Sequence, residues 1–551
     1  MASTLTLTER LFKRGIGKRR IPLGLLLAAS AVAAFIATPL IYILFRGATG
    51  GLEVWSRLLQ TRLAELLFNT LSLAVTVTAG TVVLGVALAF LVERTDLPGR
   101  RLWRWLLAMP LAIPAFIGAV VHVALWRPRG GLVPQLLAGW LGHPVDLPSP
   151  FGFGGAVMML TLFMYPYVYL LSAAAFRSLH ASLEEVARSL GRSPLQAVWQ
   201  VVLPALRPGL SAGALLVALD ILAEYGTVSF LRYQTFSAAI FLQLTGRYDR
   251  AAAAVLSAVL AAIGVAILWG EIRFQGQARF YQMTSGWRPA PPTKLGRWTW
   301  PALLFVIGVV TMSLIVPVTM LVIWTIQGFS DPTELATLWR FSGEGVFVYA
   351  WNSLWSAGLA ALLAVILSLP IAYLAVRYPR RTSLWIAQLC QVGYALPGVV
   401  IALSIILLVN RLFPFLYATP LIVVLAYVLR HMPQAVRSSQ AALQQVPPNL
   451  EEAAQSLGRN PLRAFINVTL PLVLPGLFAG GGLVFLTSLK ELPATLLLRP
   501  AGFDTLAVRF WITASEGVYT QAAPSALLLI LCAAVPLYVL LRREITLTRR
   551  R

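Results

Sequence analysis

Residues 183–195 read LEEVARSLGRSPL, and residues 450–462 read LEEAAQSLGRNPL. The longer segments 183–210 and 450–477 agree at 17 of 28 positions without a gap, at an offset of 267 residues. Three residues upstream align at an offset of 283 instead, namely Asn69, Arg94 and Pro114 with Asn352, Arg377 and Pro397. The chain therefore contains an internal repeat, with one copy in each half. The offsets differ by 16 residues, which places an insertion in the first half, in the Gly- and Pro-rich loop 127–152.

The composition is that of a membrane protein. Of 551 residues, 58% are apolar and only 12% are charged, and the mean hydropathy is +0.77. A soluble protein carries about 25% charged residues. The only two cysteines, Cys390 and Cys532, lie in apolar runs, which argues against a disulfide framework and against a cysteine metal site.

Twelve apolar stretches are each about long enough to cross a hydrocarbon core of ~30 Å. They lie at 21–46, 68–93, 102–126, 153–176, 208–230, 251–270, 298–327, 349–376, 384–409, 418–435, 475–497 and 522–541. Their continuous apolar character favours helices over a barrel. We predict an all-α polytopic membrane protein of twelve transmembrane helices, arranged as two parallel six-helix repeats. The expected parts are a basic tail 1–20, a first half 21–270, a linker 271–297, a second half 298–541 and a basic tail 542–551.

The net charge of +23 follows the expected topology. With the N-terminus in the cytoplasm, 31 of the 44 Lys and Arg residues fall in cytoplasmic segments. The positive-inside rule therefore predicts that both termini are cytoplasmic, and it removes the reason to expect a nucleic-acid partner. The first apolar run exceeds the 7–15 residues of a cleavable signal core, so we expect an uncleaved first span.

The strongest part of the repeat is a cytoplasmic loop, and its residues predict a helix–turn–helix in each copy. Ser182 with Glu185, and Asn449 with Glu452, have the spacing of a capping box. Gly191 and Gly458 are expected to end the first helix in the left-handed conformation. The second helix should begin at Ser193-Pro194 or Asn460-Pro461 and close at Leu203-Pro204 or Leu470-Pro471. Since a mere tether needs no capped helices, the duplicated loop indicates a docking element for a partner with two equivalent sites.

These loops resemble the EAA loop of ABC-importer permeases, with Val186 as one conservative departure. The resemblance implies a coupling helix that docks on an ATP-hydrolysing subunit. It assigns the coupling role to Glu184, Glu185, Ala187, Gly191, Glu451, Glu452, Ala454 and Gly458. It also implies two ATPase copies per chain. The chain has no Gly-x4-Gly-Lys-Ser/Thr loop, so ATP and Mg²⁺ are expected on that separate ATPase, with no cofactor and no enzymatic activity in this chain.

A competing motif is the Gly-x-Ser-x-Gly pattern of Gly209–Gly213, which elsewhere indicates a nucleophilic serine. The repeat keeps both glycines, as Gly476 and Gly480, but replaces Ser211 by Phe478. This pattern is typical of a small-xxx-small helix contact and argues against a protease.

Charged residues inside the predicted spans are candidates for the transport pathway: Asp220, Glu224, Lys490 and Glu491. Glu224 and Glu491 are equivalent in the repeat, so they would face each other in a pseudo-twofold channel. Two carboxylates, helped by Asp220 and the phenolic oxygen of Tyr225, would suit a hard, highly charged cation, with Glu224 and Glu491 as transient metal ligands. The alternative is that both glutamates cap or bridge helices at the ends of spans, with Lys490 neutralising Glu491.

The segments 490–507, 223–226 and 234–240 resemble ferric-iron importer permeases. This resemblance implies a bacterial inner-membrane subunit that receives Fe³⁺ from an extracytoplasmic binding protein. Permeases for thiamine, phosphonate or polyamine are the nearest alternatives. A gradient-driven secondary transporter is a more distant one, since it would not need duplicated docking loops.

Overall fold

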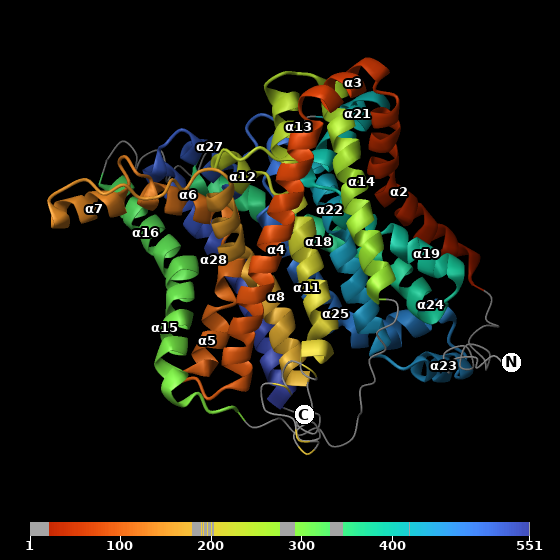
Figure 1. Cartoon of the computed structure of the whole chain (residues 1–551). Helices are drawn as coiled ribbons and strands as arrows, with labels where there is room; N and C mark the ends of the chain where they lie inside the picture. Colours follow the sequence, from red (N-terminus) through yellow and green to blue (C-terminus); the bar gives the residue numbers. More distant parts are fainter. Residues whose placement is uncertain are drawn as a thin grey trace. The chain divides into compact units, whose positions relative to one another are not determined.

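The computed structural model describes residues 21–178, 203–275, 292–330, 345–417 and 419–549, together with four isolated positions between 189 and 200. The described residues are helical throughout, apart from turns and one isolated bridge between Thr95 and Thr293 (Figure 1). The chain forms two compact units that do not coincide with its two sequence halves.

The larger unit comprises Gly50–Ala350 and Leu506–Ala534. Its helices are α3 (Leu52–Thr61), α4 (Leu63–Arg94), α5 (Arg100–Leu106), α6 (Ala115–Trp126), α7 (Leu132–Leu141), α8 (Phe153–Ser178), α11 (Leu203–Ala223), α12 (Gly226–Phe230), α13 (Phe236–Thr245), α14 (Arg250–Gln275), α15 (Thr299–Val310), α16 (Val316–Phe329) and α27 (Leu506–Ser515), with a 3₁₀ turn at Met109–Ala112 and a π turn at Thr311–Ile315. The α4, α8 and α11 helices pack together at its centre.

The smaller unit comprises Met1–Thr49, Trp351–Thr505 and Val535–Arg551. Its helices are α2 (Leu23–Ala48), α18 (Val346–Arg377), α19 (Arg381–Leu389), α20 (Val392–Ala395), α21 (Gly398–Leu412), α22 (Pro420–Gln444), α23 (Pro448–Ser456), α24 (Pro461–Ala464), α25 (Leu470–Leu489) and α26 (Pro493–Leu498). The last helix, α28 (Tyr519–Arg549), begins in the larger unit and ends in the smaller one.

The first helix of each sequence half packs on helices of the other half. The N-terminal α2 packs on α21, α19 and α20, and Ser404 of α21 donates a hydrogen bond of 3.2 Å to the Pro39 carbonyl of α2. Correspondingly, α16 packs on α6, and Trp324 of α16 stacks on Tyr519 with ring centroids 4.8 Å apart. Proline at position 39 frees the residue 35 carbonyl of α2, and the helix nevertheless continues.

Among the described residues, eight helices are long and apolar enough to cross a membrane, or nine if one bent pair is counted as a span. The bent pair, Arg100–Ala112 with Ala115–Trp126, turns by 94° at Ile113-Pro114. The prediction of a helical polytopic membrane protein is confirmed, whereas twelve unbroken spans are not found among the described residues. Five predicted spans contain a break or too many polar residues: 102–126, 208–230, 384–409, 418–435 and 475–497.

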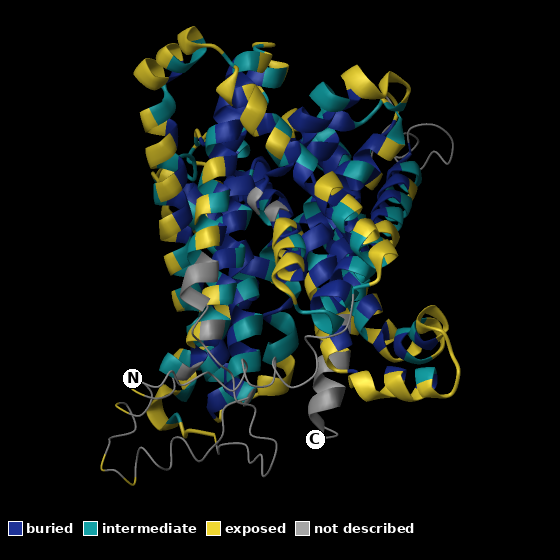
Figure 2. Ribbon diagram, turned by 90° about the vertical axis from the view of Figure 1, so that its right-hand side faces the viewer, coloured by how far each residue is buried: buried dark blue, intermediate teal, exposed yellow. Residues whose placement is uncertain are grey.

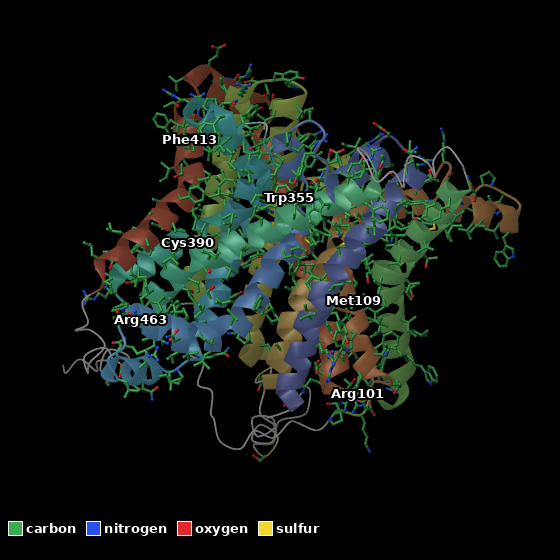
Figure 3. The ribbon with its side chains drawn as sticks, turned by 180° about the vertical axis from the view of Figure 1, so that it is seen from behind. Arg101, Met109, Trp355, Cys390, Phe413 and Arg463 are labelled. Atoms are coloured by element: carbon green, nitrogen blue, oxygen red, sulfur yellow. The ribbon has the colours of Figure 1, made fainter. Side chains whose placement is uncertain are left out.

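Burial follows the pattern of helices that face both lipid and protein. The long helices carry stripes of buried and of exposed residues along their length (Figure 2). Cys390, which Figure 3 labels, is buried and Cys532 is partly buried, and both are free thiols.

Candidate functional site

The second copy of the repeated loop forms the short helix α23, which begins at Pro448. Proline is favourable in the first helical turn because its fixed φ suits the helix and its missing N–H is not needed there. The residue before the helix is Pro447, and no side chain caps this end. The predicted capping box of Asn449 and Glu452 is therefore wrong, because Pro448 starts the helix before Asn449 can cap it.

The end of α23 and the next turn agree with the prediction. Gly458 has φ of +85°, the left-handed conformation that favours glycine, and the Arg459 N–H bonds to the Ala454 carbonyl at 3.1 Å. Asn460 then caps α24 by accepting a hydrogen bond of 2.8 Å from the backbone N–H of Arg463, which Figure 3 labels. The turn between the two helices is thus fixed by its own sequence.

The predicted end at Leu470-Pro471 is wrong. The helix that begins at Pro461 runs on to Leu489 as one candidate span, through a π turn at Phe465–Thr469. Proline removes one N–H and conflicts with the carbonyl four residues earlier. The wider π turn directly before Pro471 accommodates both effects. The second helix of the loop therefore continues into α25 without a break.

Glu451 anchors α23 to the membrane helices. Only 4% of this residue is exposed, and its carboxylate accepts hydrogen bonds from three side chains. The Tyr373 hydroxyl donates at 2.8 Å, the Arg377 guanidinium at 3.2 and 3.3 Å, and the Thr469 hydroxyl at 2.5 Å. Because Tyr373 and Arg377 lie at the end of α18, and Thr469 lies at the π turn, the carboxylate ties three helical segments together.

Glu452, the next residue, is exposed, as is Ala453, whereas Ala454 is buried. A helix turns by about 100° per residue, so adjacent glutamates point in different directions. The two glutamates of this loop therefore do different things: Glu451 faces the membrane helices and Glu452 presents a carboxylate on the outer surface of α23.

The first copy of the loop lies largely outside the described residues. This holds for Glu184, Glu185 and Ala187, whose predicted role therefore stays a prediction. Gly191 is described, and its φ of +80° gives it the same left-handed conformation as Gly458. A glycine in the left-handed conformation is thus present at this position in both copies.

An ion-pair cluster around a buried carboxylate joins the ends of three helices in the larger unit. The Glu93 side chain, 2% exposed, receives Arg104 at 2.6 Å and Arg177 at 2.9 Å. These residues come from α4, α5 and α8. A charge-assisted bond at a buried carboxylate fixes the relative positions of the helices that supply its donors.

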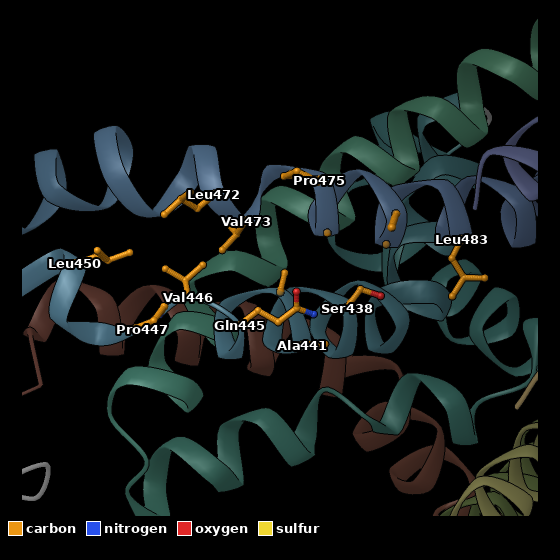
Figure 4. Close-up of a pocket in the computed structure, with 14 residues that line it drawn as sticks. Ser438, Ala441, Gln445, Val446, Pro447, Leu450, Leu472, Val473, Pro475 and Leu483 are labelled. Carbon is orange, nitrogen blue, oxygen red and sulfur yellow. The ribbon is translucent and has the colours of Figure 1, made fainter. Parts of the chain in front are cut away.

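A groove of about 610 Å³ opens between α22 and α25 and reaches the start of α23 (Figure 4). Its lining is mostly small and apolar, with Ser438 and Gln445 as its polar side chains, and Pro447 and Leu450 lie at the α23 end. The groove therefore lies between two helices and adjoins the start of α23 at one end.

The glycines of the Gly-x-Ser-x-Gly pattern form helix contacts in both halves. A Cβ on Gly476 or Gly480 of α25 would lie only 2.5 Å from a Cβ of α22, on Ala442 or Ser438. In the first half, Gly209 and Gly213 of α11 face α8 in the same way, at 3.2–3.3 Å. The small-xxx-small interpretation is confirmed.

We expect Gly480→Ala to destabilise the chain by ~1–3 kcal/mol, because the new methyl group overpacks a tight helix contact. Gly482 on the same helix is the matched control, since nothing lies within 4 Å of its Cβ position. Gly482→Ala should leave stability unchanged or slightly higher, because alanine is the better helix former. Thermal unfolding of the detergent-solubilised chain measures both, and equal melting temperatures would contradict the contact.

Glu491 lies at the break between α25 and α26 and is 6% exposed. Its Oε2 atom lies 2.9 Å from the Arg430 Nε of α22 and 4.0 Å from His431 Nε2. Its Oε1 atom accepts a hydrogen bond of 3.4 Å from the Ala494 N–H. A Cβ on Gly398 would lie only 2.2 Å from this oxygen, so the carboxylate fits there only because residue 398 is glycine. This carboxylate therefore bridges helices and caps α26, with Arg430 of α22 as a counter-ion.

Glu224 occupies the equivalent break between α11 and α12. Its Oε1 atom accepts the Thr227 N–H at 2.8 Å, the same bond that joins Glu491 to Ala494 in the other half. Asp220 is partly buried one turn earlier on α11. The Tyr225 ring packs on Phe241 and Trp511, with centroids 4.2 and 5.6 Å away. The capping interpretation thus describes what both glutamates do in this conformation.

Sequence reasoning missed the partners of these carboxylates. Arg430 lies at the end of an apolar run, a position that indicates a partner for a charge inside a span. The positive-inside rule explains the same arginine as a cytoplasmic charge, so it was not a candidate for the site. Asn69 and Asn352 aligned in the repeat without an assigned role. Both donate to a backbone carbonyl beyond the break, Asn69 to Gln234 at 3.1 Å and Asn352 to Asp504 at 3.0 Å. Within the described ranges, no group of three or more His, Cys, Asp or Glu side chains could hold a metal ion.

Comparison with known proteins shows the family to which the chain belongs. The model of the family "Binding-protein-dependent transport system inner membrane component" matches twice, at residues 82–320 and 364–543. The chain is 36% identical to the Fe(3+)-transport system permease protein FbpB 2 of Haemophilus influenzae, over 95% of this chain and 98% of that protein. It is 24% identical to the ferric transport system permease protein FbpB of Actinobacillus pleuropneumoniae, over 87% and 71% of the two chains. A probable molybdenum ABC transporter permease of Haloferax volcanii is 33% identical over 43% of this chain and 88% of its own length. The chain belongs to the inner-membrane components of binding-protein-dependent transport systems, the permeases of ABC importers.

Proposed function

We propose that this chain is the fused permease of an ATP-driven ferric-iron importer. The observation that carries the mechanism is α23, a helix anchored to the membrane helices through Glu451 and exposing Glu452 beside it. Two ATPase subunits would dock on the two copies of the loop and supply ATP and Mg²⁺. An extracytoplasmic binding protein would deliver the cargo on the opposite face.

Ferric iron is supported by the near-complete alignment with a permease named for Fe³⁺ transport. The molybdenum permease matches over less than half of the chain, so molybdate is the weaker alternative. The test is the ATPase activity of the complete complex in lipid, with binding protein loaded with ferric ion, molybdate, thiamine or a phosphonate. Stimulation by the iron-loaded protein alone supports the proposal. Stimulation by another cargo alone contradicts iron and keeps the importer class.

The finer topology is twelve spans with both termini in the cytoplasm of a bacterial cell, as two six-span halves at 21–270 and 298–541. The eight long helices and the bent pair supply nine of them. The remaining three would be two broken spans, α11 with α12 and α19 to α21, and the continuous but more polar helix α22. Non-helical backbone at membrane depth is tolerated where protein or an aqueous cavity covers it. Cysteine accessibility at Arg10 and Arg549 from either side of the membrane tests the orientation.

The coupling role extends to the first copy through the repeat. Glu184 would anchor the first coupling helix as Glu451 anchors the second, and Glu185 would face the ATPase as Glu452 does. Ala187 and Ala454 would pack against the membrane helices. Gly191 and Gly458 would set the turn that fixes the lever angle.

Glu224 and Glu491 would contact the ferric ion transiently as it passes the two helix breaks, with Asp220 and Tyr225 nearby on the first-half side. For Glu491 this contact requires that its ion pair with Arg430 opens. The breaks support this role because backbone and carboxylate oxygens gather there, and oxygen is the ligand that hard cations prefer.

Substitutions at Glu224 separate this role from simple capping. Glu224→Gln keeps an oxygen that can accept the Thr227 N–H but removes the charge, whereas Glu224→Ala removes both. If the charge serves transport, both variants should lower ferric-ion uptake by about tenfold or more, a factor equivalent to ~1.4 kcal/mol. Near-normal uptake by Glu224→Gln beside a loss in Glu224→Ala would assign the residue to capping alone. Reconstituted proteoliposomes with radioactive iron provide the measurement.

A further inference from the structure

The helix α7 lies in the loop that carries the insertion of the first half. Nine of its ten residues are apolar or glycine, and Gln135 is the one polar residue. Leu132, Leu136 and Trp140 share one face and are exposed, with exposed fractions of 65% for Leu136 and 85% for Trp140. Ten helical residues extend about 15 Å, half of a hydrocarbon core, so α7 cannot be a span.

The angle between α7 and α6 is fixed by a tight turn. The Gly131 N–H bonds to the Arg127 carbonyl at 3.0 Å. A Cβ on Gly131 would lie 2.3 Å from the carbonyl oxygen of Arg127 and 2.8 Å from that of Leu125, so only glycine fits. Gly142, with φ of +75°, ends α7 in the left-handed conformation. The exposed face is therefore held rigidly, at the end of a membrane helix.

The direction of α7 identifies what covers its apolar face. Figure 1 shows α7 extending sideways beyond α16, at the level where α16 ends. The outer end of α16 exposes Val322, Ile326 and Phe329, side chains that suit lipid tails. A rigid helix that projects past them lies over the surface of the surrounding bilayer.

The residue types fit this position. Tryptophan is enriched at membrane interfaces because its ring is apolar and its N–H is polar. Arg127 and Arg129, both exposed, lie in the turn that precedes α7, where they can pair with lipid phosphates. A docking surface for a soluble protein would be expected to carry a polar rim, and α7 offers only Gln135.

We propose that α7 is an interfacial helix that buries Leu132, Leu136 and Trp140 at the boundary between lipid headgroups and acyl chains. It would anchor the first half to one leaflet and hold its neighbouring loop, residues 143–152, close to the membrane. The repeat gives the second half no counterpart, so the anchor makes the two halves unequal. The inference needs only a chain that spans a bilayer, and it stands or falls independently of cargo and coupling.

The test is an environment-sensitive fluorophore on a single cysteine, in full-length chain that carries Cys390→Ala and Cys532→Ala. Leu136→Cys reports the proposed lipid face, and Asp146→Cys, an exposed position in the same loop, is the matched control. In nanodiscs containing anionic lipid, the probe at 136 should be quenched by nitroxide on the upper acyl chain. Its quenching by aqueous iodide should be at least about threefold weaker than at 146, because the helix lies within the interface.

Equal iodide quenching at 136 and 146, without quenching by the lipid nitroxide, would overturn the proposal. Protection of position 136 that appears only when the loaded binding protein is added would also overturn it, because α7 would then be a protein-docking surface. Neither cysteine replaces a buried side chain in the loop, so the fold of the labelled chains should match that of the parent, as size-exclusion chromatography can verify.

Discussion

Replacing Glu451 by alanine is expected to abolish transport and to lower the stability of the chain. The substitution leaves the Arg377 guanidinium, whose side chain is 8% exposed, without the carboxylate that it binds in α23. Breaking a buried ion pair by removing one partner costs ~3–5 kcal/mol. The Tyr373 and Thr469 hydroxyls lose their acceptor in the same step. We expect α23 to separate from α18, so that a bound ATPase no longer moves the membrane helices.

Glu452→Ala is the matched control for this prediction, because it removes a carboxylate from the same helix at an exposed position. The melting temperature of the solubilised chain should fall much further for Glu451→Ala than for the exposed Glu452→Ala. Transport by the complete complex should fall in both variants, in Glu452→Ala through weaker ATPase docking. If Glu451→Ala unfolds at the same temperature as the parent chain, the anchoring role is wrong. If Glu452→Ala transports normally, the division of labour between the two glutamates is wrong.

Replacing Arg430 by methionine should have an effect of similar size, because it removes the counter-ion of Glu491 at membrane depth. We expect a loss of ~3–5 kcal/mol and little folded protein in the membrane. The double variant Arg430→Met with Glu491→Gln removes both charges and should recover much of the stability. Arg411→Met, at the exposed end of α21, is the control for the loss of an arginine.

Expression level and melting temperature of these three variants measure the effect. Failure of the double variant to recover any stability would mean that Arg430 acts through contacts other than Glu491, such as its 3.1 Å bond to the Leu396 carbonyl. If the double variant regains stability but not iron uptake, the Glu491 carboxylate is needed for transport as well as for folding.

Features that depend on neighbouring residues could be predicted from the sequence. Gly458 ends a helix because glycine alone adopts its backbone conformation without strain, and Asn460 caps the next because its side chain reaches the Arg463 N–H. The duplicated glycines correctly indicated a close helix contact. The predicted start of α23 was wrong because the helix begins at Pro448, directly after Pro447, and not at a capping box. The predicted end of the second helix of the loop was too early because a π turn accommodates Pro471.

Features that depend on distant residues could not be predicted. Tyr373 and Glu451 are 78 residues apart, and no local pattern indicates that they meet. Hydropathy also averages over the breaks at Glu224 and at Glu491, so it merged short helices into predicted spans. The sequence singled out both glutamates as unusual. Only their hydrogen bonds distinguish a cap from a residue that is exposed to cargo.

The exchange of first helices between the sequence halves sets the order in which the chain can fold. The α2 helix is synthesised long before its partner, because Ser404, which bonds to its Pro39 carbonyl, follows 365 residues later. At ribosomal speeds of about 5–20 residues per second, roughly 20–70 s pass before this partner emerges. During that time α2 must remain inserted in the bilayer as a solitary helix, and the smaller unit cannot assemble. Because both halves are on one polypeptide, α21 is synthesised on the same chain as α2, and the two helices can pack without a second subunit.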